Sequence, residues 1–374
     1  MIPFNKPYLT GKETKYIETA VATGKISGNG VFTQKCQQFF EDTYGFKKAL
    51  LTTSCTDALE MCAILADINS GDEVIVPSYT FVSSALAFVR QNANIIFADS
   101  YTDNPNIDAD KIESLITDKT KAIVIVHYAG IACDMEKILE IAEKHNLIII
   151  EDAAQAIDSY YIFKDGTKKA LGSIGHLGAF SFHETKNIIS GEGGMLTIND
   201  ERFINRAEII WEKGTNRSMF FRGEINKYGW VDTGSSFLPS EIISAFLWAQ
   251  LENIHPIQEK RLKIWNKYHD ELKNNENIDL PVIPEYATNN AHMFYIICKD
   301  LKHRTELIKK LKEHNILAVF HYLSLHKSEF YASRHVHGEL TNSDHFEDCL
   351  LRLPLFYELT EAEQQSIIEV INNF

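Results

Sequence analysis

Long apolar segments are missing from this chain. No run of about 18 apolar residues occurs, which is the length that crosses a lipid bilayer. The first residues, MIPFNKPYLTGKETKYIE, lack a basic segment followed by an apolar one, so a secretory signal is not predicted either. We therefore expect a cytoplasmic protein that makes no use of a membrane.

Cysteine is scarce and scattered. The six cysteines include no C-x-x-C pair. This disfavours both a disulfide framework and a zinc site, because each needs cysteines at characteristic spacings. We expect reduced, mostly structural thiols and no metal centre.

Positive charge is in deficit. Lys and Arg number 37 against 51 Asp and Glu, which gives a formal net charge of −14. Such a balance disfavours binding to nucleic acids or to anionic membranes. An anionic small ligand must therefore meet local donors, such as the backbone N–H groups at a helix N-terminus.

Two nucleotide-binding motifs are absent as well. A Rossmann dehydrogenase needs G-x-G-x-x-G after a strand, and a P-loop enzyme needs G-x-x-x-x-G-K-[ST]. Neither pattern occurs, and the GEGG cluster at residues 191–194 follows a lysine instead of opening a helix. The sequence thus argues against both classes.

From residue 49 onward, short β-branched runs alternate with helical patterns. EVIVPS, NIIFADS, KAIVIVHYAG and LIIIEDAAQ are typical of buried strands, and DMEKILEIAEKHN predicts a helix capped by Asp134. This alternation predicts an α/β fold with a mostly parallel sheet covered by helices. Ligands of such folds gather at the carboxyl ends of the strands. The polar residues that follow the runs are Ser78, Asp99, His127, Asp152 and Ser181.

Two domains are predicted. The α/β pattern extends over residues 1–250, and residues 251–374 contain enough strand and helix patterns for a smaller α+β domain. A long helical stretch after Pro239 is expected to connect them, with a bend near Pro256.

Lys186 and Asp152 suggest a reaction. Asp152 closes the apolar run LIIIEDAA, and a carboxylate buried at a strand end needs a cationic partner. A protonated pyridine nitrogen would suit it, and a lysine that reaches the same crevice could form a Schiff base with pyridoxal phosphate. The alternative is that Asp152 caps a helix and that Lys186 is an ordinary loop lysine.

A phosphate site is predicted before the helical pattern TDALEMCAIL. Ser54, Cys55 and Thr56 would offer hydroxyls and free backbone N–H groups there, although a simple helix cap explains the same residues. Ser181 could add another hydroxyl. Phe81 is a candidate for stacking on a planar cofactor, with a place in the core as the alternative.

The order of these signals resembles one known arrangement. The chain is similar to the DegT/StrS-type sugar aminotransferases, which depend on pyridoxal phosphate and have the fold-type I architecture of aspartate aminotransferase. The similarity runs nearly end to end and is most specific in EDAAQ followed by SFHETKN. It implies a large domain with a mostly parallel seven-stranded sheet and a smaller α+β C-terminal domain.

The resemblance also implies roles for individual residues. Lys186 would be the Schiff-base lysine and proton shuttle, Asp152 would hold the pyridinium nitrogen, and Gln155 would bond the ring hydroxyl. Most of the family has an asparagine from the neighbouring subunit at the cofactor phosphate, in a segment like G-Y-N-Y-R-M-S. This chain reads GSSFLPS there, with Ser236 at the asparagine position. The phosphate contacts of the chain itself would be Ser54, Cys55, Thr56 and Ser181.

Substrates and assembly follow from the same resemblance. MIPFNKP, SFHETKN and EKGTNRSMFFRGEINKYGW favour members that transfer an amino group from L-glutamate to C4 of dTDP-4-keto-6-deoxyglucose, giving dTDP-4-amino-4,6-dideoxygalactose for cell-surface polysaccharides. The expected assembly is a homodimer. Residues implied near the substrate are Asn216, Arg217, His321, Tyr322 and His326. Arg217 would bind a diphosphate or the donor carboxylate, and a structural role is the alternative for the two histidines.

One other function stays open at this point, and two more are disfavoured. The enzyme could aminate C3 of a keto sugar or give the other epimer, because a few pocket residues can change that choice. A related sugar dehydratase would have histidine in place of Lys186, so the lysine argues against it. A non-catalytic protein that retains the fold is disfavoured by the presence of Asp152, Gln155 and Lys186 together.

Overall fold

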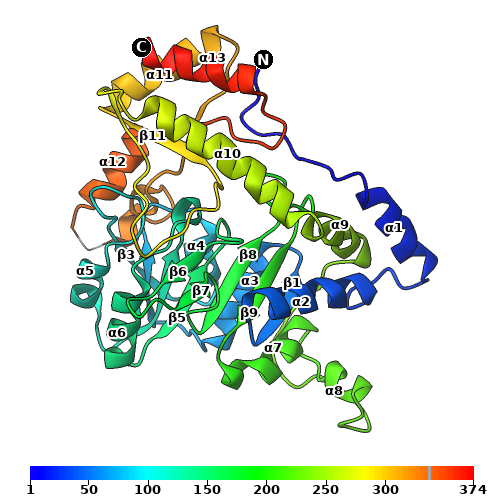
Figure 1. Ribbon diagram of the computed structural model, residues 1–374. Helices are drawn as coiled ribbons and strands as arrows, with labels where there is room; N and C mark the ends of the chain where they lie inside the picture. The colour runs from blue at the N-terminus through cyan, green and yellow to red at the C-terminus, as the bar shows by residue number, and fades with distance from the viewer. Residues whose placement is uncertain (336–337) are drawn as a thin grey trace.

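A seven-stranded sheet forms the centre of the larger part of the molecule (Figure 1). The computed structural model describes residues 1–335 and 338–374. All strands of this sheet run parallel except β9, which is antiparallel to both of its neighbours. Their order across the sheet is β1 (Lys48–Thr52), β9 (Gly194–Ile198), β8 (Leu177–Ser181), β5 (Ile148–Asp152), β4 (Thr120–Val126), β2 (Glu73–Pro77) and β3 (Asn94–Ala98).

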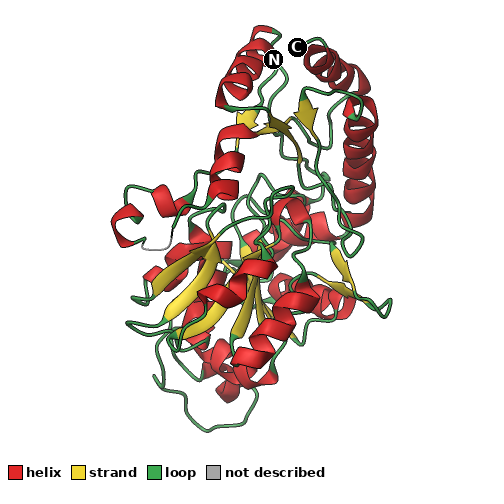
Figure 2. Ribbon diagram, turned by 90° about the vertical axis from the view of Figure 1, so that its left-hand side faces the viewer, coloured by secondary structure: helices red, strands yellow, loops and turns green. Residues whose placement is uncertain are grey.

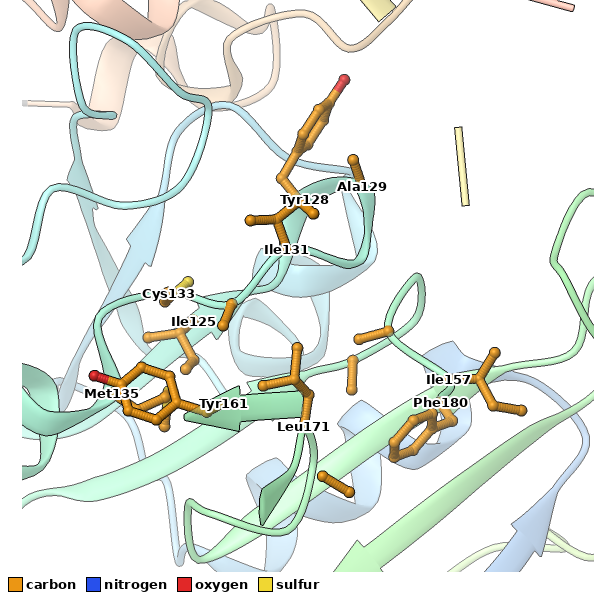
Figure 3. Packing of buried hydrophobic residues seen from close by; sticks show 14 of the residues in the cluster. Ile125, Tyr128, Ala129, Ile131, Cys133, Met135, Ile157, Tyr161, Leu171 and Phe180 are labelled. Atoms are coloured by element: carbon orange, nitrogen blue, oxygen red, sulfur yellow. The ribbon is translucent and has the colours of Figure 1, made fainter. Parts of the chain in front are cut away.

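The sheet is buried on both faces, as the apolar strand runs predict. Successive residues of β4 alternate between two hydrophobic clusters: Ile123 and Ile125 belong to one, and Ala122 and Val124 to the other. Helices flank the sheet accordingly (Figure 2). Figure 3 shows part of the first cluster, in which Ile125 lies with side chains of the segment that follows β4. The α/β class and the seven-stranded sheet predicted from the sequence are confirmed.

Helix α6 of this part begins at the position that the sequence predicts. Asp134 accepts a hydrogen bond from the Lys137 backbone N–H (3.3 Å) and so caps α6 as expected. The main helices are α1 (Glu13–Ala22), α2 (Val31–Tyr44), α3 (Cys55–Leu65), α4 (Ser83–Val89), α5 (Ala109–Ile112), α6 (Met135–His145), α7 (Ile204–Trp211) and α8 (Arg217–Phe221). A separate hairpin is formed by β6 (Tyr160–Ile162) and β7 (Lys168–Ala170).

A smaller antiparallel sheet forms the other part of the molecule. Its strands lie in the order β10 (Ile278–Asp279), β11 (Phe294–Cys298), β13 (Leu350–Leu353) and β12 (Val319–Phe320). The core beside this sheet includes Trp265 and Phe294. The helices of this part are α10 (Ile254–Leu272), α11 (Leu301–Glu313), α12 (Thr341–Cys349) and α13 (Glu361–Asn372).

The connector between the two parts is broken before the expected place. Helix α9 (Glu241–Leu251) ends, and α10 starts at Ile254, so the break precedes Pro256. Pro256 lies in the first turn of α10, where its missing N–H removes no helical hydrogen bond. The bend predicted near Pro256 is therefore present, between Leu251 and Ile254.

The chain termini both lie at the smaller part (Figure 1). The Ile2 backbone N–H donates to the Asn315 carbonyl (2.7 Å), which ties the N-terminal segment to this part. Helix α10 contributes Ile257 to a core cluster of the large part and Ile264 to the core of the small one. The division at residue 250 stays a prediction. No helix among the described residues has both the length and the apolar character that a membrane crossing needs.

Candidate active site

A cavity of about 1010 Å³ opens at the carboxyl ends of the parallel strands. Asp152, the last residue of β5, and Ser181, the last of β8, line it from the large part. Tyr322 and Arg352 line it from the small part. This is the position at which the strand pattern places a ligand site.

Lys186 reaches this cavity from the loop between β8 and β9. The loop folds back on itself through hydrogen bonds from the Phe182 N–H to the Gly193 carbonyl (2.8 Å) and from the Glu184 N–H to the Gly191 carbonyl (2.9 Å). Burial lowers the pKa of the Lys186 amine, while nearby Cys55 and Asp152 act in the opposite direction. A neutral amine is thus accessible at lower pH than for a solvated lysine.

The glycines after Lys186 serve two different purposes. A Cβ on Gly194 would lie 2.3 Å from the Ser54 carbonyl carbon, and one on Gly193 would lie 2.4 Å from the Ser190 hydroxyl, so both glycines permit close approach. Gly191 has φ +82° and open space around it. At Gly191 it is therefore the backbone conformation, not close approach, that favours glycine.

Asp152 is a buried carboxylate that binds a hydroxyl and a backbone N–H. The Ser84 hydroxyl donates to it at 2.6 Å and the Ala154 N–H at 3.1 Å. Burial raises the pKa of the Asp152 carboxyl, and the Ser84 bond partly offsets this. A cationic ligand nitrogen beside Asp152 would favour the ionised carboxylate.

A buried pair lies directly behind Asp152. His127 Nδ1 accepts from the Cys133 N–H at 3.2 Å, so Nε2 carries the proton and donates to Glu151 at 2.9 Å. The His127 backbone N–H also donates to the Asp152 carbonyl (3.2 Å). This pair holds the end of β5 in place, and His127 does not line the cavity.

The N-terminus of α3 also faces the cavity, at Ser54, Cys55 and Thr56. Ser54 is indeed the helix cap, because its hydroxyl accepts from the Asp57 N–H (3.1 Å). Its own proton remains available to an anion. The Thr56 hydroxyl bonds Ser83 (2.7 Å), and burial raises the pKa of the Cys55 thiol, which keeps it neutral.

Aromatic and amide groups complete the wall of the large part. Phe81 lines the cavity with its side chain 55% exposed, so it is available to stack, whereas Tyr79 is buried in the core. Gln155 accepts from the Ala129 N–H (2.6 Å) and donates to the Tyr322 hydroxyl (2.9 Å).

This set of groups fits pyridoxal phosphate. The helix N-terminus offers donors for a phosphate, Asp152 offers a carboxylate for a pyridinium nitrogen, and Lys186 offers an amine, all on one wall. Each of these groups has the charge or the hydrogen-bond donors that its expected contact with the cofactor requires.

The predicted substrate residues fall into separate groups. His321 and Tyr322 line the cavity, and the His321 Nδ1 bonds the Tyr128 hydroxyl (2.7 Å). His326 lies outside the cavity wall, where its Nδ1 bonds Ser78 (2.7 Å). Asp99, another early candidate, accepts from the Ser343 N–H (2.8 Å) and so binds the N-terminus of α12.

Asn216, Arg217 and Ser236 belong to a segment away from this cavity. Helix α8, which starts at Arg217, projects from the body of the molecule (Figure 1). Arg217 lies 3.8 Å from the Glu212 carboxylate, and Ser236 pairs with Glu212 in an isolated β-bridge. Within one chain the structure does not bring these residues to Lys186.

Among the cavity residues that were not predicted from the sequence are His292 and Arg352. His292 donates from Nδ1 to the Asn187 side-chain oxygen (2.8 Å), because the Asn187 amide donates to Gln258 and Asn290 and leaves only an acceptor. Arg352 lies inside the apolar run LLRLPLF, and a charged residue in such a run was the signal that the sequence offered.

The fold and the site together define an α/β enzyme of the aspartate-aminotransferase type. The chain belongs to the DegT/DnrJ/EryC1/StrS aminotransferase family, whose model matches residues 7–372. It is accordingly an enzyme of the aminotransferase class.

Similar proteins extend over nearly the whole chain. GDP-perosamine synthase of Caulobacter vibrioides is 32% identical over 98% of this chain and 96% of its own. Spore coat polysaccharide biosynthesis protein SpsC of Bacillus subtilis is 29% identical over 100% of this chain and 96% of its own. A sugar aminotransferase of Streptococcus pneumoniae, Spr1654, solved in its PLP form, has the same fold with a TM-score of 0.90, at 24% identity over 100% of this chain and 98% of that one.

Proposed function

We propose that this enzyme transfers an amino group from L-glutamate to a nucleotide-linked keto sugar with pyridoxal phosphate as its cofactor. The specific reaction proposed is amination at C4 of dTDP-4-keto-6-deoxyglucose, which gives dTDP-4-amino-4,6-dideoxygalactose for cell-surface polysaccharides. One observation carries the proposal: Lys186, Asp152 and the N-terminus of α3 meet on one wall of the same cavity.

The residues of this wall have complementary tasks. Bound pyridoxal phosphate supplies an electron sink for the carbon that loses its proton. Asp152, held by Ser84, stabilises a proton on the ring nitrogen. Lys186, whose pKa is lowered by burial, acts on the substrate proton as a neutral amine. The α3 N-terminus holds the phosphate through Ser54 and the backbone N–H groups beside it.

The size of the cavity supports a large substrate. Small-molecule pockets usually measure about 300–1,000 Å³. At about 1010 Å³ this one has room for a cofactor and part of a nucleotide sugar. Its small-part wall adds neutral hydrogen-bonding groups, because burial lowers the pKa of His292 and of His321 well below the usual value.

The relatives support the substrate class more than the individual sugar. One carries the name of a GDP-linked product, perosamine, and another acts in spore coat polysaccharide biosynthesis. The choice of dTDP and of C4 rests on the resemblance of segments such as SFHETKN and EKGTNRSMFFRGEINKYGW. A cytoplasmic location belongs to the same proposal.

A homodimer is also part of the proposal. Phe221 and Trp230, in and after the projecting helix α8, are 67% and 84% exposed, which is unusual for large apolar side chains. A second copy would cover this surface. It would also bring Ser236, Asn216 and Arg217 of one chain toward the cavity of the other.

Product analysis tests the proposal. Purified enzyme with pyridoxal phosphate and L-glutamate is offered dTDP-4-keto-6-deoxyglucose, the corresponding 3-keto sugar and their GDP analogues, and the products are identified by mass spectrometry and NMR. We expect the 4-amino galactose epimer. A C3-amino product or the other epimer would contradict the proposed C4 reaction and identify the reaction that takes its place. A visible absorption band that does not respond to glutamate would indicate a non-catalytic protein.

A further inference from the structure

His292 uses one ring nitrogen outside the cavity and leaves the other to face it. It lines the cavity from the segment before β11, and its Nδ1 lies 2.8 Å from the side-chain oxygen of Asn187, which is not part of the cavity wall. The Nδ1 edge of the ring therefore points away from the cavity. The edge that carries Nε2 is left to face it.

The hydrogen bonds of Asn187 determine which ring nitrogen carries the proton. The Asn187 amide nitrogen lies 2.9 Å from the Asn290 backbone carbonyl, which can only accept, and 2.8 Å from the Gln258 side-chain oxygen. The remaining oxygen of Asn187 can only accept as well, so His292 must donate to it from Nδ1. A neutral imidazole has one N–H, and Nε2 is thus left with a free lone pair.

Burial keeps this ring neutral. It lowers the pKa of His292 well below the usual value, and the positive charges of Lys186, Arg261 and Arg352 act in the same direction. The ring therefore does not take up a second proton at neutral pH. Nε2 can accept a hydrogen bond without competing for the proton in it.

The backbone of His292 is held as firmly as the ring. Arg261, which is buried in α10, donates to the His292 carbonyl at 2.7 Å and to the Ala291 carbonyl at 3.1 Å. The His292 N–H donates to the Asn290 side-chain oxygen at 3.0 Å. The acceptor is thus in place before any ligand binds, and a preorganised group of this kind needs no rearrangement to make its bond.

The amine of Lys186 is the donor that this acceptor suits. Asn187 follows Lys186 directly in the chain, so the hydrogen bond that fixes the ring also ties it to the backbone of the lysine loop. Lys186 is also the charged group that lowers the pKa of His292 most, which places the amine near the ring. Both groups line the same cavity.

The other groups around the Lys186 amine are poor or occupied acceptors. Cys55, Asp152 and Arg352 are the groups whose charge influences its pKa. A thiol is a weak acceptor, and a guanidinium has no acceptor at all. Asp152 already binds Ser84, and the cofactor nitrogen is proposed as its further partner. His292 Nε2 is therefore a rigid acceptor to which the free amine can donate.

We propose that His292 is a positioning residue for Lys186, whose amine donates a hydrogen bond to Nε2 and is thereby held beside the substrate carbon. Asn187 contributes by keeping the proton of the ring on Nδ1. The inference rests on the proposed aminotransferase function and adds to it a group that acts through Lys186. Because Lys186 moves a proton in both half-reactions, His292 affects both.

Two substitutions separate the two nitrogens of the ring. In His292→Asn the side-chain amide can still donate to Asn187 from near the position of Nδ1, but nothing replaces Nε2. In His292→Gln the longer side chain can place an oxygen near the position of Nε2, whereas the donor to Asn187 is lost. His314→Gln is the control, because His314 is exposed and its Nδ1 lies 2.9 Å from the Lys310 carbonyl.

Cofactor-free protein gives the first readout. Nitrogen NMR of the histidine rings, assigned by comparison with His292→Asn, should show His292 of wild type protonated on Nδ1 alone. Labelling of Lys186 with acetic anhydride over a range of pH, followed by mass spectrometry, measures the pKa of its amine. That pKa should be lower in His292→Asn than in wild type, because the charged amine loses an acceptor while its other neighbours stay in place. In His292→Gln it should stay close to the wild-type value.

The two half-reactions give the second readout. Conversion of bound pyridoxal phosphate to pyridoxamine phosphate by L-glutamate, and the return reaction with the keto sugar, are followed by absorbance. We expect His292→Asn to slow both reactions about tenfold, the effect of one hydrogen bond of ordinary strength, and His292→Gln to slow them by about threefold or less. The isotope effect with α-deuterated glutamate should rise in His292→Asn, because proton transfer then becomes the slowest step.

The remaining outcomes separate the alternatives. A proton on Nε2 in wild type, or a His292→Asn variant that behaves like wild type, would overturn the assignment. A larger loss in His292→Gln than in His292→Asn, together with lower stability in urea, would overturn it in favour of a purely structural link to Asn187. A loss confined to the keto-sugar half-reaction would overturn it in favour of a contact with a sugar hydroxyl. A wild-type protein that shows the expected ring proton but reacts with no amino acid would instead contradict the proposed function.

Discussion

At the scale of single residues, the site depends on two charges that burial disfavours. The pKa of the Lys186 amine is lowered and that of the Asp152 carboxyl is raised, with burial as the largest cause in both cases. Perturbed groups of this kind, facing the same cavity, are typical of active sites. Burial thus gives Lys186 and Asp152 shifted pKa values of the kind found in active sites, which a solvated lysine and aspartate would not have.

Replacement of Lys186 tests its covalent and proton-transfer roles. Lys186→Ala should fold and still bind pyridoxal phosphate, because the α3 N-terminus and Asp152 remain. Turnover should fall by more than the 10²–10⁴-fold, roughly, that loss of an acid–base group costs. In wild type, borohydride reduction and peptide mapping should place the cofactor on Lys186. Attachment to Lys164 or Lys168, or near-normal turnover of the variant, would contradict this role.

The lowered pKa of Lys186 also predicts a pH effect on stability. In cofactor-free protein, the charged amine is disfavoured in the folded state, so the unfolded chain binds more protons between the folded pKa and the usual value of 10.5. Stability of wild type should then rise with pH through this range. Lys186→Met should be more stable than wild type at neutral pH, and the difference should shrink as the pH approaches 10.5. Urea denaturation of both proteins at several pH values measures the difference between their free energies of unfolding. A difference that does not change with pH would contradict a buried charge on Lys186.

At the scale of elements, close backbone approach holds the site together. Strand β9 starts at Gly194, whose missing side chain leaves room for the Ser54–Cys55 peptide at the start of α3. The end of the lysine loop and the start of α3 therefore lie in close contact, which only a glycine at position 194 permits.

Substitution of Gly194 should damage both stability and cofactor binding. Gly194→Ala places a Cβ within 2.4 Å of the Cys55 nitrogen. Overpacking of this kind costs about 1–3 kcal/mol, and here it also shifts the phosphate site. Gly229→Ala is the matched control, because nothing lies within 4 Å of its added Cβ. Urea denaturation and a fluorescence titration with pyridoxal phosphate measure the two effects. Equal behaviour of the two variants would show that the contact is unimportant.

Some helix starts could not be predicted from the sequence because the side chain that caps the helix lies far away in the chain. Helix α2 begins after Gly30, which has no capping side chain, and Glu241 instead accepts from the N–H groups of Phe32 (2.8 Å) and Thr33 (3.0 Å). Asp99 serves α12 in a comparable way. Local capping patterns predict a helix start only when the cap is a neighbour in sequence.

At the scale of the whole molecule, the projecting α8 segment is the surface that the proposed homodimer would cover. Its exposed aromatic side chains are of the kind that marks an interaction site. Covering them by a second copy agrees with the position of Ser236 away from its own cavity.

Assembly is therefore predicted to be at least dimeric and linked to activity. Sedimentation of wild type should give a dimer, and Phe221→Ser together with Trp230→Ser should raise the dimer Kd about tenfold or more. Ser236→Ala should weaken retention of pyridoxal phosphate more than it changes turnover at saturating cofactor. Leu301→Ser, at another exposed apolar side chain, is the control. A fully active wild-type monomer would contradict the dimer, and unchanged cofactor retention would remove Ser236 from the phosphate site.

The sequence by itself determined the α/β class, the sheet and the helix capped by Asp134. The strands follow from the spacing of apolar residues, and the helix follows from that spacing together with a capping residue next to it in sequence. Both are patterns of neighbouring residues. It also pointed to Asp152, because polar residues after apolar strands lie at one edge of a parallel sheet, and to the start of α3, because a helix N-terminus offers donors to a phosphate. The pairing of Lys186 with Asp152 followed from the need of a buried carboxylate for a cationic partner, and Gln155 came only from the family resemblance.

Only the tertiary structure decided which other residues face that edge. Arg352 and His292 come from the small part, and their approach to Lys186 depends on how the two parts of the chain pack. The same packing places His326 outside the wall and turns Asp99 into a helix cap. Such contacts join residues far apart in sequence, and no local pattern encodes them, because the free energy that forms them is the burial of whole surfaces against each other.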